Sequence, residues 1–512
     1  MVTVIPPYVD PGILEKHADR HSSGGADPLS PSAIGAAEKN HTHTPASIGA
    51  TASTHMHTPA SIGAAASAHT HTDYAAKTHS HDDKANLVNG KVPASELPDA
   101  IPAFVSWETV QDKPATFPPE THVHDEYAAK THSHDGLVDW WGFEIDMDKS
   151  DPEDCIQYTG LAAISSQAER KEWAYSKVHP SVVSKTTAEP VYFLNRANLA
   201  QKEDGTAAVI DGSAGDLCAS IDPLWWVVTR TGNRISVRLY EREVPGAVSA
   251  HKYGGAYKKY VHIGMFGATG TGCDSVYNTS TLPVRSQTLK TFRTQAKTKT
   301  SYHNPVTALT WTLYQWLFVM AYGTINSQSR FAGITGLSWN NGTYPGSNPC
   351  ISAMLTCGGE YASTTNTVPC MALYVANFTG LFWNFVDGVI WNGGTVACLT
   401  DQADVWDIEQ GYASKPASWH TFTSGIGTAA SASYIKQFKG DPYFGCFPDA
   451  TGGDSATYAA DACWSATGER CCISGGAWDD AANAGLFTVV VHYVLSDSYS
   501  DIGARLQILN AT

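Results

Sequence analysis

Charge is scarce in this sequence. Lys, Arg, Asp and Glu make up 16 % of its 512 residues, against roughly 25 % in ordinary globular proteins. Basic residues are the rarer kind, 33 against 49 acidic ones, which gives a formal net charge of −16. This balance excludes a basic DNA-binding face and a polybasic membrane-surface protein, and it leaves too few charges for a long coiled coil.

Long apolar runs and common catalytic or metal motifs are missing as well. The longest apolar run, Ala308–Tyr322, is too short to span a bilayer and predicts a buried helix. The eleven cysteines show no paired zinc-ligand spacing, so we expect mostly buried thiols. The alternative is that one or two disulfides form among them. No nucleophile elbow, P-loop or His-Glu-x-x-His motif is present, and we expect no enzyme.

The first quarter of the chain has almost no apolar runs. Only Trp107 precedes residue 138, whereas the other 14 of 15 tryptophans follow it. Twelve of the 20 histidines fall between His41 and His134. The two parts therefore cannot share one hydrophobic core, and the first must be disordered or held by something else.

A short motif repeats in this first part. Pro31-Ser-Ala-Ile-Gly-Ala36 recurs with a period of fourteen residues as Pro45-Ala-Ser-Ile-Gly-Ala50 and Pro59-Ala-Ser-Ile-Gly-Ala64. Such repetition is typical of a repetitive fibre. Six His-x-His pairs accompany it: His41 and His43, His55 and His57, His69 and His71, His79 and His81, His122 and His124, His132 and His134.

The spacing of these pairs suits metal binding by several chains. In an extended chain, residues i and i+2 point to the same side. One pair offers two nitrogens, and three parallel chains offer six, which suits an octahedral ion such as iron(II), nickel or cobalt better than zinc. The alternative is a disordered linker that binds zinc or nickel loosely; the regular recurrence favours the metal-held trimer.

The same segment resembles the start of tail-fibre proteins of tailed bacteriophages. The similarity covers Ala18–Ala36, the His-Thr-His-Thr-Pro-Ala-Ser-Ile-Gly-Ala repeats, and Ser106–Pro119. It implies parallel trimers that hold metal ions, usually iron, between His-x-His pairs along a stalk at residues 37–137. It also implies that residues 1–36 attach to the phage tail or baseplate.

The C-terminal part has the pattern of a folded domain. Leu224–Thr229 and Arg234–Tyr240 predict a hairpin, and Lys259–Phe266 predicts a third strand. Ser286–Lys297 predicts a helix, and a second helix is expected from Asn304-Pro305 to about Tyr322, ended by Gly323. Short apolar runs broken by Gly, Asn and Ser follow, so we expect an α+β fold.

Residues 215–512 resemble the C-type-lectin-like fold shared by formylglycine-generating enzymes and the phage major tropism determinant. The similarity rests on Gly380-Leu-Phe-Trp-Asn-Phe-Val-Asp-Gly388, Ser474-Gly-Gly-Ala-Trp478 and Ile502-Gly-Ala-Arg-Leu506. It implies a lectin-like, receptor-binding head. Residues 138–214 are either a connecting region or the start of that head.

In the tropism-determinant family, the segment that matches Trp478 to Arg505 displays a binding surface that a diversity-generating retroelement varies. Tyr and Trp there give rigid contact area at low entropy cost, and ordinary surface polarity is the alternative interpretation. The matching residues, which the resemblance makes receptor-binding candidates, are Trp478, Asp479, Asp480, Ala482, Asn483, Thr488, Val490, His492, Tyr493, Ser496, Asp497, Ser498, Tyr499 and Ser500.

The sequence thus predicts a fibrous, extended, trimeric stalk plus an α+β C-type-lectin-like head, in a virion protein made in the host cytoplasm. Its expected role is adsorption to a bacterial surface glycan or protein, without nucleic acid or membrane insertion. The Glu-Pro-Asn type of calcium triplet is absent, so no calcium is expected in the head. Two enzymatic alternatives stay open: a copper site using Cys463, Cys471 or Cys472, and degradation of surface polysaccharide.

Overall fold

The computed structural model describes residues 138–510, apart from residues 279, 281, 347–349 and 429–430, together with six short strands nearer the N-terminus. The chain divides into two units, Met1–Pro119 and Glu120–Thr512. The attachment segment predicted at residues 1–36 lies outside the described residues. The same holds for the predicted stalk at residues 37–137, apart from its six strands.

These six strands each contain one histidine of a His-x-His pair, and they pair antiparallel within the single chain. His43 lies opposite His55, His69 opposite His79, and His122 opposite His132. The strands are β1 (Thr42–His43), β2 (His55–Met56), β3 (Ala68–His69), β4 (His79–Ser80), β5 (Thr121–Val123) and β6 (Thr131–Ser133).

The predicted fold class is therefore wrong. The structure is 36 % strand and 16 % helix, a compact β-rich fold with a curled, half-barrel sheet; it is neither a fibrous stalk nor an α+β head. Two physical reasons explain the difference. Backbone N–H and C=O groups need partners, which the His-x-His strands find within their own chain. The short apolar runs after the two helices pair into one large sheet, so strands outweigh helices.

Residues 138–214 belong to this fold, because their strands pair with later ones. The hairpin expected at 224–240 is present as β13 and β14, and β14 pairs with β7 in a four-stranded sheet. Its order is β13-β14-β7-β8. The bounds are Trp141–Asp146 for β7, Ile156–Gly160 for β8, Trp225–Thr231 for β13 and Arg234–Tyr240 for β14.

A seven-stranded antiparallel sheet joins this early region to the C-terminus, in the order β11-β10-β9-β12-β17-β30-β18. The strand expected at 259–266 is its β17 (Val261–Gly267), next to the last strand β30 (Arg505–Leu509). The other strands are β9 (Val178–Val183), β10 (Pro190–Asn195), β11 (Asn198–Lys202), β12 (Asp216–Ile221) and β18 (His303–Pro305).

The largest sheet carries the C-terminal segments, in the order β23-β22-β21-β27-β28-β26-β24-β25, with β29 paired to β21. Every residue of β28 (Gly485–Val491) is buried between its neighbours β27 and β26. The other strands are β21 (Trp383–Asn392), β22 (Thr395–Cys398), β23 (His420–Thr423), β24 (Ser433–Phe438), β25 (Pro448–Thr451), β26 (Ala462–Ser465), β27 (Glu469–Gly475) and β29 (Ile502–Gly503).

Short elements complete the described unit. Two small hairpins are formed by β15 (Lys252–Tyr253) with β16 (Ala256–Tyr257), and by β19 (Met371–Ala372) with β20 (Val375–Ala376). Helix α2 (Gln167–Ser176) begins with a capping box between Ser166 and Glu169. The helix expected at 286–297 is α3 (Leu289–Lys297), which starts later because Thr288 caps it.

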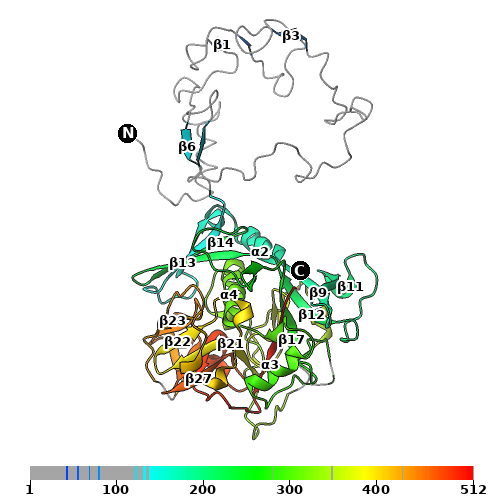
Figure 1. Cartoon of the computed structure of the whole chain (residues 1–512), viewed down its shortest axis with the longest axis vertical. Coiled ribbons are helices and arrows are strands. Elements are labelled where there is room, and N and C mark those ends of the chain that lie inside the picture. Colours follow the sequence, from blue (N-terminus) through cyan, green and yellow to red (C-terminus); the bar gives the residue numbers. More distant parts are fainter. Residues whose placement is uncertain are drawn as a thin grey trace. The chain divides into compact units, whose positions relative to one another are not determined.

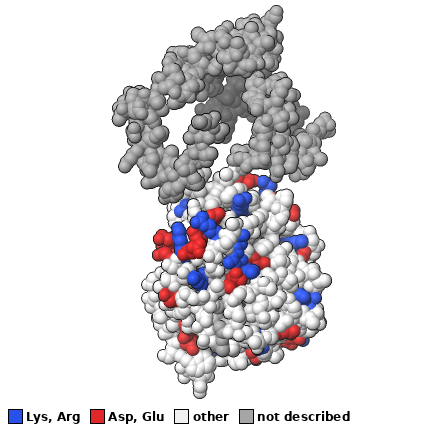
Figure 2. Space-filling view, turned by 90° about the vertical axis from the view of Figure 1, so that its left-hand side faces the viewer, with Lys and Arg blue, Asp and Glu red and all other residues white. Residues whose placement is uncertain are grey.

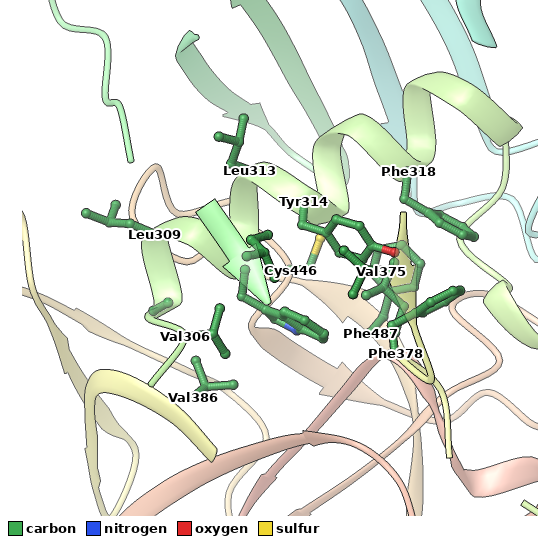
Figure 3. Close-up of a cluster of buried hydrophobic side chains, with 14 of the residues drawn as sticks. Val306, Leu309, Leu313, Tyr314, Phe318, Val375, Phe378, Val386, Cys446 and Phe487 are labelled. Carbon is green, nitrogen blue, oxygen red and sulfur yellow. The ribbon is translucent and has the colours of Figure 1, made fainter. Parts of the chain in front are cut away.

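Helix α4 (Ala308–Tyr322) lies at the centre of the core (Figure 1). Its residues are buried from Ala308 to Ala321, which confirms the predicted buried helix. In Figure 3, Tyr314 and Phe318 extend from this helix toward Phe378 and Phe487. The helix ends at Gly323, as expected, but it begins after Thr307, because Asn304 and Pro305 belong to β18. Among the described helices, none is long and apolar enough to cross a membrane.

Candidate functional site

Two stacked tryptophans mark one surface of the described unit. Trp339 is 54 % exposed, and its ring lies parallel to that of Trp478 at 5.7 Å between centroids. Trp478 itself is fully buried, because Tyr344 and Phe382 pack edge-on against its ring at 5.8 and 5.6 Å. Trp339 is thus the ring that a partner can contact, and Trp478 supports it.

A pair of tyrosines lies on the loop that follows β28. The rings of Tyr493 and Tyr499 are 5.1 Å apart, and Tyr499 is 47 % exposed. Backbone bonds fix both positions: Cys471 N donates to Tyr493 O at 3.0 Å, and Ser286 N donates to Tyr499 O at 3.0 Å. The rings are therefore presented by an anchored loop, which lowers the entropy cost of contact.

The tryptophan and tyrosine loops adjoin each other. A Cβ atom added at Gly342 would lie 2.4 Å from Ser500 Oγ, so the loop that carries Trp339 runs against the loop that carries Tyr499. Gly342 also has a φ of +75°, in the left-handed region that favours glycine. A larger residue at this position would push the two loops apart. We call the surface formed by Trp339, Tyr493, Tyr499 and the carboxylates beside them the aromatic–acidic surface.

Four carboxylates complete this surface. Asp480 accepts a hydrogen bond from Ala477 N at 2.6 Å, and Asp497 accepts one from Val494 N at 2.8 Å. Burial raises the pKa of Asp480 to about 7, and the nearby charges of Asp479 and Asp501 add to the shift. Burial also raises the pKa of Asp479 and of Asp501. Asp479, Asp480 and Asp501 are therefore held where their charged forms are poorly solvated.

Three of the predicted receptor-binding residues cannot take that role directly. Trp478 and Thr488 are fully buried and Val490 is 3 % exposed. Thr488 and Val490 belong to β28, which is central in its sheet and has both of its faces covered. The predicted residues that remain at least partly exposed are Asp479, Asp480, Ala482, Asn483, His492, Tyr493, Ser496, Asp497, Ser498, Tyr499 and Ser500.

The predicted metal ligands fall in the least described part of the chain. His43, His55, His69, His79, His122 and His132 lie in described strands, for which only the backbone pairing is known. His41, His57, His71, His81, His124 and His134 lie outside the described residues. Within the described residues, no group of three His, Cys, Asp or Glu side chains is placed to hold a metal ion.

The cysteines give no support to a copper site. All eleven lie in the described part of the chain, and none of them forms a disulfide there. The Sγ atom of Cys463 donates to Ser433 O, whereas that of Cys471 donates to Tyr493 O. Burial raises the pKa of both thiols to about 12. Such thiols stay protonated at neutral pH and are poor metal ligands.

The raised pKa of Asp480 predicts a pH-dependent stability. The pKa of Asp480 is near 7 in the folded state, against an ordinary value of 3.8. The protonated carboxyl group therefore contributes stability that is fully present below about pH 4. This contribution is lost as the pH rises through 7. We expect Asp480→Asn, which keeps an acceptor for Ala477 N, to raise the free energy of unfolding by roughly 2 kcal/mol at pH 8 and by little at pH 4. Urea unfolding at both pH values measures this, and a gain that is equal at both would contradict it.

The chain was compared with protein-family models and with curated proteins, and it matches none of them. What the aromatic–acidic surface can do is therefore argued from its own chemistry. Exposed rings stack on sugar or peptide faces, and carboxylates accept hydrogen bonds from hydroxyl or amide groups. The geometry thus favours the binding of a polar partner.

Proposed function

We propose that this chain is a receptor-binding protein of a phage tail, which recognises the bacterial surface and mediates adsorption. The observation that carries the proposal is the aromatic–acidic surface. Trp339 and Tyr499 are among the few large hydrophobic side chains that are exposed in the described residues. They lie on adjoining, anchored loops, and anchored aromatic residues dominate the energetics of many interfaces.

The charge distribution also supports recognition through polar and aromatic contacts. On the face shown in Figure 2, charged side chains of both signs gather near one end of the described unit, and most of the remaining surface is uncharged. A mixed arrangement of this kind gives little long-range attraction for a highly charged polymer. Neutral or weakly charged glycans and protein edges suit such a surface better.

The proposal includes a homotrimer with metal ions held by the His-x-His pairs. Its support is the sequence: three copies of one pair supply six imidazoles, which match an octahedral first-row ion such as iron(II). Metal binding would supply free energy that the apolar-poor first quarter of the chain cannot obtain by burial. Three binding surfaces in one particle would then convert weak contacts into avidity.

A tail-associated enzyme that degrades surface polysaccharide is the second candidate. The observation that favours it is Asp480, because a carboxyl group with a pKa near 7 beside other acids is suited to general acid catalysis. Loss of polysaccharide viscosity on incubation with the purified chain would support this candidate. Unchanged viscosity together with cell binding would support adsorption without cleavage.

Competition with the phage tests the proposed function. Host cells are incubated with the purified full chain and then with phage that carries it, and free phage is counted. We expect the chain to occupy the receptors and to block adsorption at saturation. Adsorption that proceeds at the normal rate on cells saturated with chain would contradict the proposal.

A further inference from the structure

An exposed aliphatic side chain marks the part of the surface at which the described unit begins. Ile164 is 84 % exposed, the largest value among the exposed large hydrophobic residues of the described chain. Val138, the first residue of the continuous described range, is 46 % exposed. Ala163 is exposed as well, and Trp140 is half-buried. We call the surface formed by Val138, Trp140, Ala163 and Ile164 the Ile164 surface.

Backbone contacts bring the two parts of this surface together. Leu161 N donates to Trp140 O at 2.9 Å, next to the β7–β8 pairing of Trp141 with Gly160. A Cβ atom added at Gly160 would lie 2.4 Å from Trp140 O, so the two backbone segments are in direct contact. The surface therefore combines the start of the described unit with the short 3₁₀ helix that follows β8, Leu161–Ile164.

The turn that carries Ile164 is held in one conformation. Ser165 Oγ donates to Leu161 O at 2.9 Å. The guanidinium group of Arg170 donates to Ala162 O at 3.0 Å and also to Ser165 O. Ala162 is fully buried beneath the turn. Because the turn is already ordered, a partner that covers Ile164 loses little affinity to the entropy cost of ordering it.

The charges next to this surface are balanced. Helix α2, which follows the turn, carries two acidic and two basic residues, which are Glu169, Arg170, Lys171 and Glu172. Two ion pairs lie beside it, Asp139 with Arg242 and Lys177 with Glu241, the second at 2.7 Å. The whole chain has a net charge of −16, so copies of it repel one another overall. A contact between copies is least opposed where acidic and basic residues are equal in number.

The chain before Val138 determines which partner reaches this surface. The predicted stalk at residues 37–137 ends directly before Val138, and the last stalk histidine, His134, is four residues away. Four residues reach at most about 14 Å when fully extended. In the proposed trimer, three copies of Val138 are therefore tethered close to one shared ring of histidines. The partner that this tether brings to the Ile164 surface is a second copy of the chain.

We propose that the Ile164 surface is a contact between copies of this chain, in which the Ile164 side chains pack together around the threefold axis. The inference rests on the homotrimer of the proposed function and adds to it a contact made by the described unit itself. The apolar area is small, well below that of a stable interface, so the contact orients the three copies and the metal holds them together.

This contact also fixes the direction in which the binding surfaces point. Helix α2 and strand β14 lie at one end of the described unit, and β27, which precedes Trp478, lies at the other (Figure 1). Copies that touch through the end with α2 leave the end with the aromatic–acidic surface free. Three such surfaces then face the same way, as simultaneous binding to one cell surface requires.

Cross-linking through Ile164→Cys tests the contact in the full chain. The native cysteines are buried, apart from the half-buried Cys357, so a short bis-maleimide should give no covalent dimer of the unchanged chain. Three introduced thiols at one axis allow a single pair, so we expect about two-thirds of the variant chains to run as covalent dimers on a denaturing gel. The matched control is Val209→Cys, which is 44 % exposed outside the Ile164 surface and should run as single chains.

The outcomes separate this contact from the trimer on which it rests. A particle with the mass of three chains whose Ile164→Cys variant does not cross-link would overturn the contact and leave the trimer standing. A particle with the mass of one chain would overturn both. Equal cross-linking of the Val209→Cys control would show random collision and would also overturn the contact.

Ile164→Asp provides a second check, because it changes an exposed side chain and should leave the fold intact. In the trimer it removes the aliphatic contact and brings three carboxylates together. The mass of the particle should therefore fall at least about tenfold faster after a chelator is added. Val209→Asp is the matched control and should leave this rate unchanged. An Ile164→Asp variant that dissociates at the same rate as the unchanged chain would contradict the packing of Ile164 at the axis.

Discussion

Replacing Tyr493 and Tyr499 together by alanine is expected to reduce phage adsorption at least about a hundredfold. A buried interface aromatic commonly contributes about 2 kcal/mol, which is roughly thirtyfold in affinity for one surface. Three surfaces in one particle multiply the loss, since each tethered contact raises the effective concentration of the next. The rate at which free phage disappears from a suspension of host cells measures the effect.

The fold should survive this double substitution, because the hydrogen bonds at both positions use backbone atoms. Cys471 N and Ser286 N keep their acceptors at Tyr493 O and Tyr499 O. The matched control is Tyr412→Ala, which removes a half-buried ring outside the aromatic–acidic surface. We expect the control to change adsorption less than about twofold. Normal adsorption by a folded Tyr493→Ala, Tyr499→Ala variant would remove this surface from the account.

Local patterns in the sequence predicted local elements well. The hairpin at β13 and β14 follows from two strand-forming runs joined by a Gly-Asn turn, and the end of α4 follows from Gly323 in the left-handed region. The burial of α4 follows from its almost continuous apolar sequence. Each of these signals lies within about twenty residues of the element that it determines.

Features that depend on distant segments could not be predicted in the same way. Trp478 is buried by Trp339, Tyr344 and Phe382, all far earlier in the chain. Thr488 is buried because β28 lies between β27 and β26, and nothing in its own run reveals which strands flank it. The exposed ring of the pair is Trp339, which was not among the predicted receptor-binding residues. The early strands β7 to β11 were not predicted, since each is only five or six residues long.

The small cleft lined by Tyr253, Lys297, Asn304, Gln402 and Gln507 shows the same limit. Lys297 and Asn304 are close in sequence, but Tyr253, Gln402 and Gln507 come from three other parts of the chain. No spacing rule connects them. Their convergence depends on the pairing of β30 with β18, which brings the C-terminus next to Asn304.

Removal of metal is expected to separate the subunits. If each trimer fills six His-x-His levels with one ion, the purified protein carries two iron atoms per chain. A strong chelator then withdraws the ions, and the apolar-poor first part of the chain has little other free energy to hold three copies together. Changing one pair, His122→Ala with His124→Ala, should lower the iron content by about one atom per trimer. The matched control His179→Ala, in the described unit, should leave it unchanged.

The mass of the full chain in solution, measured by light scattering before and after addition of the chelator, tests the metal-held trimer most directly. The account predicts three times the mass of one chain without chelator and the mass of one chain with it. A single-chain mass before chelation, or a mass that the chelator leaves unchanged, would contradict it.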